Sequence, residues 1–176
     1  DNIVANSCFI GSVIARDDIT KVNTIRGYIG GLCGNVVDDN ILNCYFVGTV
    51  LDETAAYVGI LIGTNESYSV SNCYYKYYPT ILDLTGDHKP TINCTSFSGS
   101  GNTWVLADPQ FINGAYHSDL VETLNAWVDA NNTGNIYNSW IGDISMNNGG
   151  YPLLNIINSP ELYVIAASVN PSNGGN

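Results

Sequence analysis

Apolar residues in the first half of the chain alternate with small or polar residues in short runs, and the same runs recur. Residues 6–13 read NSCFIGSV and residues 43–50 read NCYFVGTV, a gapless match that keeps Asn, Phe, Gly and Val in place. Alternate residues of a strand share one face. The repeat therefore predicts two equivalent strands. In the first strand Ser7, Phe9, Gly11 and Val13 share one face, and in the second the equivalent face is formed by Cys44, Phe46, Gly48 and Val50.

A second run also occurs twice, as YIGGLCG in residues 28–34 and YVGILIG in residues 57–63. In an extended strand Ile29, Gly31 and Cys33 would share a face, and Leu32 and Leu61 would point the other way. A strand that is apolar on both faces is typical of a sheet covered on both sides, as in parallel sheets. We expect each run to be a buried strand of this kind, separated by polar turns.

An asparagine starts each run and breaks the alternation, at Asn6, Asn43, Asn72 and Asn93. Asparagine tolerates left-handed backbone geometry and hydrogen-bonds its own backbone, so we expect it at a bend between two short strands. Stacked bends would place the Asn43 and Asn72 amides one above the other. An ordinary turn asparagine without stacking is the alternative.

Self-similarity at a spacing of about 20 to 40 residues is the signature of stacked repeats that bury their apolar faces against one another. We therefore expect a mainly β chain that forms a short right-handed parallel β-helix, or β-solenoid, with one packed α-helix. Residues 82–90 and 96–102 are rich in turn residues, so the repeat is expected to degrade into two loops there.

The helix is expected over residues 118–132, where the apolar period becomes helical. Leu120, Leu124, Trp127 and Val128 form its stripe. Asp119 and Glu122 resemble a capping box, and Gly134 provides a stop. This stripe should cover the end or flank of the stack, and Trp140 and residues 151–154 should supply a last strand or two.

The composition changes after Pro160. Residues 1–158 are expected to form one domain, and residues 159–176 a linker followed by the first strand, residues 162–169, of a following module. Asp1 lies close to the first repeat, so we expect a piece of a longer secreted or surface protein.

The charge and length of the chain exclude some classes of function. A 176-residue chain with 45% apolar residues can bury a core. Its net charge of −11 argues against nucleic acid or an anionic membrane surface as partner. No apolar run approaches the ~18 residues that span a bilayer. We expect a monomer that does not insert into a membrane.

Five cysteines occur without CxxC pairing or a nearby histidine, which argues against a zinc or thioredoxin-type site. Cys44 and Cys73 hold the same place in consecutive repeats, so they should lie one above the other at ~4.8 Å. We expect them, with Cys33, to be reduced and buried as small hydrophobes. A Cys44–Cys73 disulfide is the alternative.

Catalytic candidates are few. The acidic doublets Asp17-Asp18 and Asp38-Asp39 lie in spacer loops, and neighbouring strand residues point to opposite faces, so neither makes a glycosidase pair. Calcium at Asp38-Asp39-Asn40 is conceivable, but the ligand spacing is irregular. The basic residues Arg16, Lys21, Arg26, Lys76 and Lys89 flank no acidic cluster, and His88 and His117 are interpreted as surface histidines. We expect no catalytic or metal-binding residue and no cofactor.

Four tyrosines surround Lys76: Tyr74, Tyr75, Tyr77 and Tyr78. An aromatic face with a polar tip suits a sugar ring, so this is the candidate ligand-binding surface. Tyrosine is also a favoured strand residue, and half-buried strand tyrosines are the alternative.

The unit N-C-Y-x-x-G-x-V, followed by a spacer and V-G-G-L-x-G, resembles the GLUG motif of bacterial cell-surface proteins and adhesins, and covers residues 3 to about 100. The close WIGDISMNNGGYPLL, residues 140–154, resembles the W-x-x-D-x-x-x-N-N-G-Y-P-x-L ending that follows such repeats in gut Bacteroidetes proteins. The tail resembles the start of an internalin B-repeat-like module. The first repeat departs from the motif at Ser7, and the second at Ile60.

This resemblance implies a non-catalytic adhesin or structural module of a larger secreted protein, located outside the cell or on a bacterial cell surface. Its implied partner is a host or bacterial surface glycan or an extracellular protein. The alternative from another class is a carbohydrate-binding or carbohydrate-degrading β-helix domain.

Overall fold

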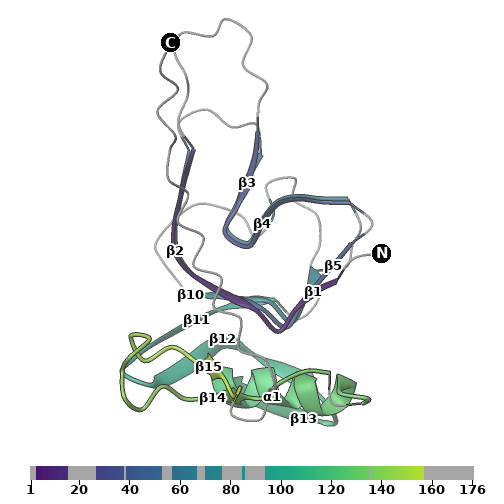
Figure 1. Cartoon of the computed structure of the whole chain (residues 1–176), viewed down its shortest axis with the longest axis vertical. Helices are drawn as coiled ribbons and strands as arrows, with labels where there is room; N and C mark the ends of the chain where they lie inside the picture. The colour runs from purple at the N-terminus through teal and green to yellow at the C-terminus, as the bar shows by residue number, and fades with distance from the viewer. Residues whose placement is uncertain are drawn as a thin grey trace, which may run out of the picture.

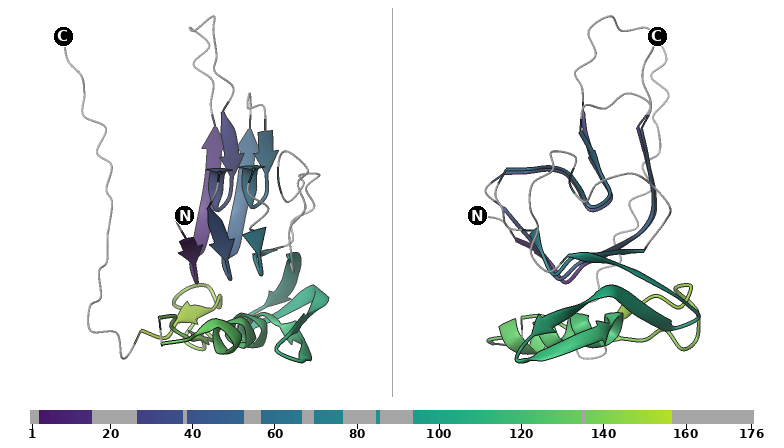
Figure 2. Two further views of the ribbon diagram at one scale, coloured as in Figure 1. Left: turned by 90° about the vertical axis from the view of Figure 1, so that its right-hand side faces the viewer. Right: turned by 180° about the vertical axis from the view of Figure 1, so that it is seen from behind.

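A computed structural model describes residues 3–15, 27–37, 39–52, 57–66, 70–76, 85, 94–134 and 136–156. Within these ranges the protein is mainly β and contains one helix. Two layers are visible in Figures 1 and 2. The described residues between 3 and 76, which we call the parallel stack, form one layer. Residues 94–156, which we call the cover, form the other.

The parallel stack consists of strands from successive repeats that pair side by side in the same direction. One sheet has the order β1 (Ile3–Ala5), β5 (Asn40–Leu42), β9 (Val70–Ser71). A second contains β2 (Cys8–Ala15), β6 (Tyr45–Asp52) and β10 (Tyr74–Lys76), all parallel. This sheet continues into the cover, where β11 (Thr95–Ser100) pairs parallel with β10. Two further pairs are β3 (Tyr28–Gly30) with β7 (Tyr57–Gly59), and β4 (Cys33–Val36) with β8 (Ile62–Asn65).

The register of the parallel strands places equivalent residues of successive repeats side by side. Phe9 pairs with Phe46, Gly11 with Gly48 and Tyr28 with Tyr57, and in Figure 1 the strands of successive repeats lie one behind another. The sequence repeats therefore occupy equivalent positions in space, which confirms the parallel pairing that they predicted.

The asparagine bends are also confirmed. Asn6, Asn43 and Asn72 have φ of 54°, 51° and 50°, the left-handed geometry expected of them. The predicted stacking of the asparagine side-chain amides is only partly formed. Asn43 Nδ2 donates to Asn6 Oδ1 at 2.8 Å, but Asn43 Oδ1 accepts no hydrogen bond in the described structure. The predicted amide contact from Asn72 to Asn43 Oδ1 is therefore missing.

The prediction that residues 28–34 form one strand is wrong. The chain bends at Gly31 and Leu32 and separates β3 from β4, and the second repeat bends in the same way at Ile60 and Leu61. Because of this bend Leu61 lies in the same core cluster as Ile60, not on the opposite face. A side chain at Gly30 would collide with the Cys33 carbonyl oxygen, which explains the glycine at the bend.

The first three residues of β6, Tyr45, Phe46 and Val47, are buried on both faces of the strand and separate two cores, whereas Thr49 and Leu51 further along are exposed. Cys44, Phe46 and Val50 face the core inside the stack, as their alternation predicted. Tyr45 and Val47 face a second core, which the cover completes. A strand in this position needs apolar residues at nearly every position.

Residues 96–102 were expected to be a loop, and this is wrong. Strand β11 continues into an antiparallel meander with β12 (Thr103–Ile112) and β13 (Ala115–Asp119). Gly99 pairs with Trp104, and a side chain there would collide with the Thr103 carbonyl oxygen, so the strand itself requires this glycine. The pairing of β12 with β13 shifts register between Val105 and Gln110, a stretch that includes Pro109.

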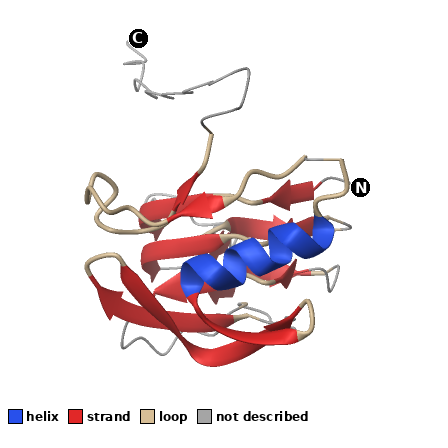
Figure 3. Ribbon diagram, turned by 90° about the horizontal axis from the view of Figure 1, so that it is seen from below, coloured by secondary structure: helices blue, strands red, loops and turns tan. Residues whose placement is uncertain are grey.

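The predicted helix is confirmed as α1 (Leu120–Asn131). The Asp119 side chain caps it by accepting a hydrogen bond from the Glu122 N–H, and Leu120, Leu124, Trp127 and Val128 are all buried. Figure 3 shows that the helix lies across the strands on the cover side, so it protects the flank of the stack. The predicted last strands are β14 (Trp140–Ile141) and β15 (Leu153–Leu154), which pair antiparallel.

Thr85, within the predicted loop at 82–90, forms an isolated parallel bridge with Ile62 of β8. The other residues of 82–90 lie outside the described structure, as do residues 157–176, which include the predicted linker and the strand at 162–169. Asp17, Asp18, Asp38 and His88, and the bases Arg16, Lys21, Arg26 and Lys89, lie outside it too.

Candidate functional sites

The proposed tyrosine platform is not assembled as expected. Tyr74 is fully buried in the core between the stack and the cover, and this burial raises the pKa of its hydroxyl well above the usual value. Tyr75 is half-buried and packs against the core inside the stack. Neither ring is a free face for a sugar, because β10 is covered on both sides. Tyr77 and Tyr78 lie outside the described residues.

The thiols of Cys44, Cys73 and Cys94 form a column through the stack. Cys44 Sγ donates to the Leu42 carbonyl at 3.1 Å, and Cys73 Sγ donates to the Ser71 carbonyl at 3.3 Å. All five cysteines are free, and Cys44 and Cys73 are buried as predicted, whereas Cys33 is only half-buried. Burial raises the pKa of the Cys73 thiol well above its usual value. The column therefore packs as a row of small side chains inside the stack.

The closing segment, residues 140–154, has a structural role that the sequence did not reveal. The buried Asp143 carboxylate accepts hydrogen bonds from the backbone N–H groups of Asn147, Asn148 and Gly150. Burial acts to raise the pKa of Asp143, but these bonds, with one from Ser145, outweigh it and hold the pKa below its usual value. Asp143 thus organises a tight loop.

That loop is joined to the stack by aromatic side chains. Trp140 Nε1 donates to Asn6 Oδ1 at 2.6 Å, and the Tyr45 hydroxyl donates to the Pro152 carbonyl. Trp104 Nε1 donates to the Gly150 carbonyl at 2.7 Å. The Trp-Asp-Asn-Asn-Gly-Tyr-Pro pattern is therefore explained by docking of the loop.

Lys76 is held in place by aromatic residues of the cover. Its amino group donates to the Tyr151 hydroxyl at 2.6 Å and lies 5.1 Å from the centre of the Trp104 ring. A lysine held over aromatic faces contributes to packing through a cation–π contact.

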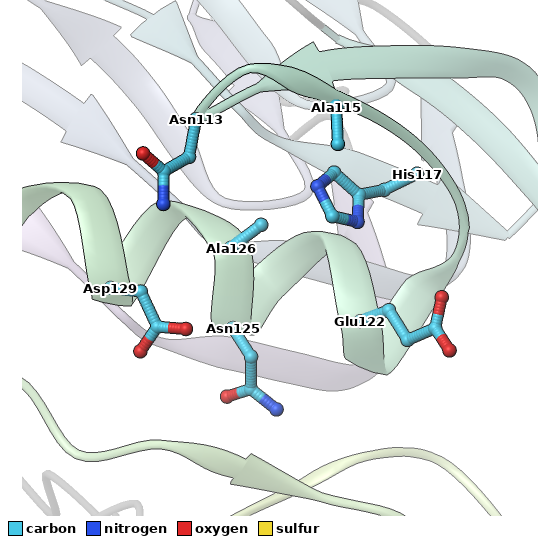
Figure 4. Close-up of a pocket in the computed structure, with 7 residues that line it drawn as sticks. All are labelled: Asn113, Ala115, His117, Glu122, Asn125, Ala126 and Asp129. Atoms are coloured by element: carbon cyan, nitrogen blue, oxygen red, sulfur yellow. The ribbon is translucent and has the colours of Figure 1, made fainter.

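A cleft of about 400 Å³ lies between β13 and α1. Its lining residues are Asn113, Ala115, His117, Glu122, Asn125, Ala126 and Asp129. His117 Nε2 lies 3.3 Å from the Ile112 carbonyl oxygen. Figure 4 shows Glu122 and Asp129 at opposite ends of the cleft. They are two helical turns apart in the sequence of α1, about 10 Å along the axis.

An exposed aromatic pair lies on the β12–β13 hairpin. Phe111 and Tyr116 are directly opposite in the pairing, with ring centres 5.0 Å apart, and are 57% and 75% exposed. Along β12 the buried residues Trp104, Leu106 and Ile112 alternate with exposed ones, so Phe111 points away from the helix. The alternation in TWVLADPQFI was the signal that could have revealed this surface.

Within the described ranges, no group of three or more His, Cys, Asp or Glu residues is arranged to hold a metal ion. The helix in that part of the chain is not long and apolar enough to cross a membrane. No protein-family model, curated protein or solved structure matches the chain.

Proposed function

We propose that this chain is a non-catalytic structural or adhesive module of a larger secreted or cell-surface bacterial protein, related to the GLUG-repeat proteins that its motifs resemble. The observation that carries the proposal is that residues repeated in the sequence pack against one another in the structure. Phe9 stacks on Phe46, Tyr28 stacks on Tyr57, and Asn43 bonds to Asn6. Repeats whose residues are used for packing suit a scaffold.

The proposed architecture is a short right-handed parallel β-helix. Its support is that four separate sets of parallel strands keep one register from repeat to repeat. The covering helix and loop protect one flank of it. Residues 159–176 remain assigned to a linker and the first strand of a following module.

A binding role is favoured over an enzymatic one because the charged groups near the candidate sites either have structural partners or lie far from one another. Asp143 is occupied by backbone N–H groups, Lys76 by aromatic rings, and Glu122 and Asp129 lie apart. We therefore expect no release of reducing ends or unsaturated products from polygalacturonate or host glycans. Turnover above background would overturn the non-catalytic assignment.

Carbohydrate binding is the second candidate, and Phe111 and Tyr116 are the observation that favours it. Two exposed rings on a rigid hairpin offer the apolar faces that pyranose rings stack upon. They replace the tyrosines around Lys76 as the candidate surface, because Tyr74 is buried.

One screen tests both candidates. The purified chain is applied to arrays of glycans and of extracellular-matrix proteins, alongside a Phe111→Ala, Tyr116→Ala double variant. Ile144→Ala, which truncates another exposed apolar residue, is the matched control. Glycan binding that only the double variant loses supports the carbohydrate candidate. Binding to a matrix protein supports adhesion, and the absence of any ligand on both arrays contradicts it.

A further inference from the structure

One end of the parallel stack presents an open strand edge. Strand β2 is the last strand of its sheet, and in the described structure no strand pairs with its outer edge. Its side chains Phe9, Ile10 and Ile14 are 41%, 40% and 48% exposed. An eight-residue edge with apolar side chains and unpaired backbone groups is a template for a further strand.

The side-chain columns of the stack stop at this edge. The Phe9 ring stacks on Phe46 with centres 5.8 Å apart, and the Ser12 and Thr49 hydroxyls are hydrogen-bonded at 2.9 Å. Tyr28 stacks on Tyr57, with ring centres 5.5 Å apart. Each column pairs a residue with its equivalent one repeat later, so the outer side of each column fits another copy of the same pattern.

A glycine gives independent evidence for what fits there. A Cβ at Gly48 would overlap the carbonyl oxygen of Gly11 in the neighbouring strand, so Gly48 must be glycine for β2 to pair with β6. A Cβ at Gly11 would meet only the ring of its own Phe9, at 3.1 Å, among the described residues, although the φ of 159° at Gly11 also disfavours a side chain. The structure therefore leaves beside Gly11 the space that a carbonyl oxygen occupies beside Gly48.

We infer that the β2 edge is a docking surface for a further repeat unit, whose strand carries an aromatic-x-glycine pattern and runs parallel to β2. Its glycine carbonyl would enter the space beside Gly11, as the Gly11 carbonyl does beside Gly48. A second copy of this chain related by a two-fold axis would present its own β2 antiparallel, and would not align like with like. The inference rests on the stacked architecture in the proposed function, not on adhesion.

The test extends the full chain at its N-terminus with a second copy of residues 3–39, so that the added unit precedes Ile3. Hydrogen exchange followed by mass spectrometry reports each unit separately. We expect the amides of the added strand and of β2 to exchange at least about tenfold more slowly than unprotected ones. In the same extended chain, Gly11→Ala at the original position should return the added strand to unprotected exchange.

The unextended chain with Gly11→Ala is the control, and its β6 and β10 amides should stay protected. An added unit that exchanges freely while β6 stays protected would overturn the docking inference and leave the stack intact. Free exchange of β6 in the unextended chain would instead refute the stack. A dimer of the unextended chain, seen by light scattering, that protects β2 would also overturn the inference, because the edge would then bind a second copy.

Discussion

The parallel stack and the cover are stabilised by different means. In the stack, a small set of residues recurs at matched positions, so that each strand is held by a near-copy of itself, as Phe46 is by Phe9. In the cover, unlike residues meet once, such as Trp104 with Tyr151 and Trp127 with Tyr137. The difference shows that repetition can fix backbone pairing, while closing the exposed flank requires residues that do not repeat.

The two regions meet at the asparagine bend. Asn43 Nδ2 donates both to Asn6 Oδ1 in the stack and to the Leu124 carbonyl of the helix. Asn6 in turn bonds to the Asn138 carbonyl and to Trp140. The asparagine column therefore does more than link repeats, since it also joins the stack to the cover.

The largest effect is expected from removing the aromatic anchor of the cover. Trp140 is almost fully buried and contacts Tyr45 and Asn6. Trp140→Ala should lower the free energy of unfolding by about 3 to 5 kcal/mol, measured by urea denaturation. Loss of the cover core alone, with the stack amides still protected from exchange, would show that the regions unfold separately. A change below about 1 kcal/mol would mean that the cover does not depend on this anchor.

The next largest loss of stability is expected at one of two glycines within the stack. Gly48→Ala places a methyl group against the Gly11 carbonyl and should cost about 3 kcal/mol, at the upper end of the range for overpacking. Gly11→Ala meets no backbone atom among the described residues, but it places a side chain at a φ of 159°, so it should cost less than Gly48→Ala, about 1 to 2 kcal/mol. Urea midpoints of the two variants decide this, and equal midpoints would contradict the proposed close approach.

Substitution of the junction asparagine should have a smaller effect. Asn43→Ala leaves Asn6 with one hydrogen bond fewer and places alanine in left-handed geometry, so a loss of about 1 to 3 kcal/mol is expected in urea. Asn43→Gly is the matched control, because glycine adopts this φ without strain. If Asn43→Ala is as stable as the original chain, the amide contributes nothing to the junction.

The stack could largely be predicted from the sequence, because its information is local and repeated. The matched runs fixed the parallel pairing, and the parity break at Asn43 fixed a left-handed bend. The bend at Gly31 was missed because alternation alone cannot distinguish one strand from two joined at a glycine. The burial of the free thiols of Cys44 and Cys73 followed from the same repeat.

The cover could be predicted only where it has local signals. The helix has its cap at Asp119 and a regular stripe, and both were recognised. Strand β11 was read as a loop because SFSGSG has the composition of a turn, and its strand geometry is imposed by the partner strand that closes on Gly99. The role of Asp143 depends on backbone groups up to seven residues away, and the exposed Phe111–Tyr116 pair depends on which face the helix covers.

The pH dependence of stability should distinguish the cover from the stack. Because hydrogen bonds hold the folded-state pKa of Asp143 below its value in the unfolded chain, this carboxylate stabilises the fold at neutral pH. Its contribution is fully present above the ordinary carboxyl pKa of about 4 and is lost as pH falls through the lowered folded pKa. The stability difference between the original chain and Asp143→Asn should therefore shrink as pH is lowered below about 4. A difference that stays constant with pH would show that the carboxylate charge is not involved.

The smallest effect is expected from the tail, which the sequence assigns to neither region. All the core residues that the structure describes lie within residues 3–156, around Phe46 and around Leu124. A chain that ends at Ser159 should therefore melt at nearly the same temperature as the full chain, with unchanged light scattering. A fall of more than about 5 °C, equivalent to about 1 kcal/mol at this size, would show that residues 160–176 are part of this domain. The difference between the two regions would then have to include a third element that stabilises one of them.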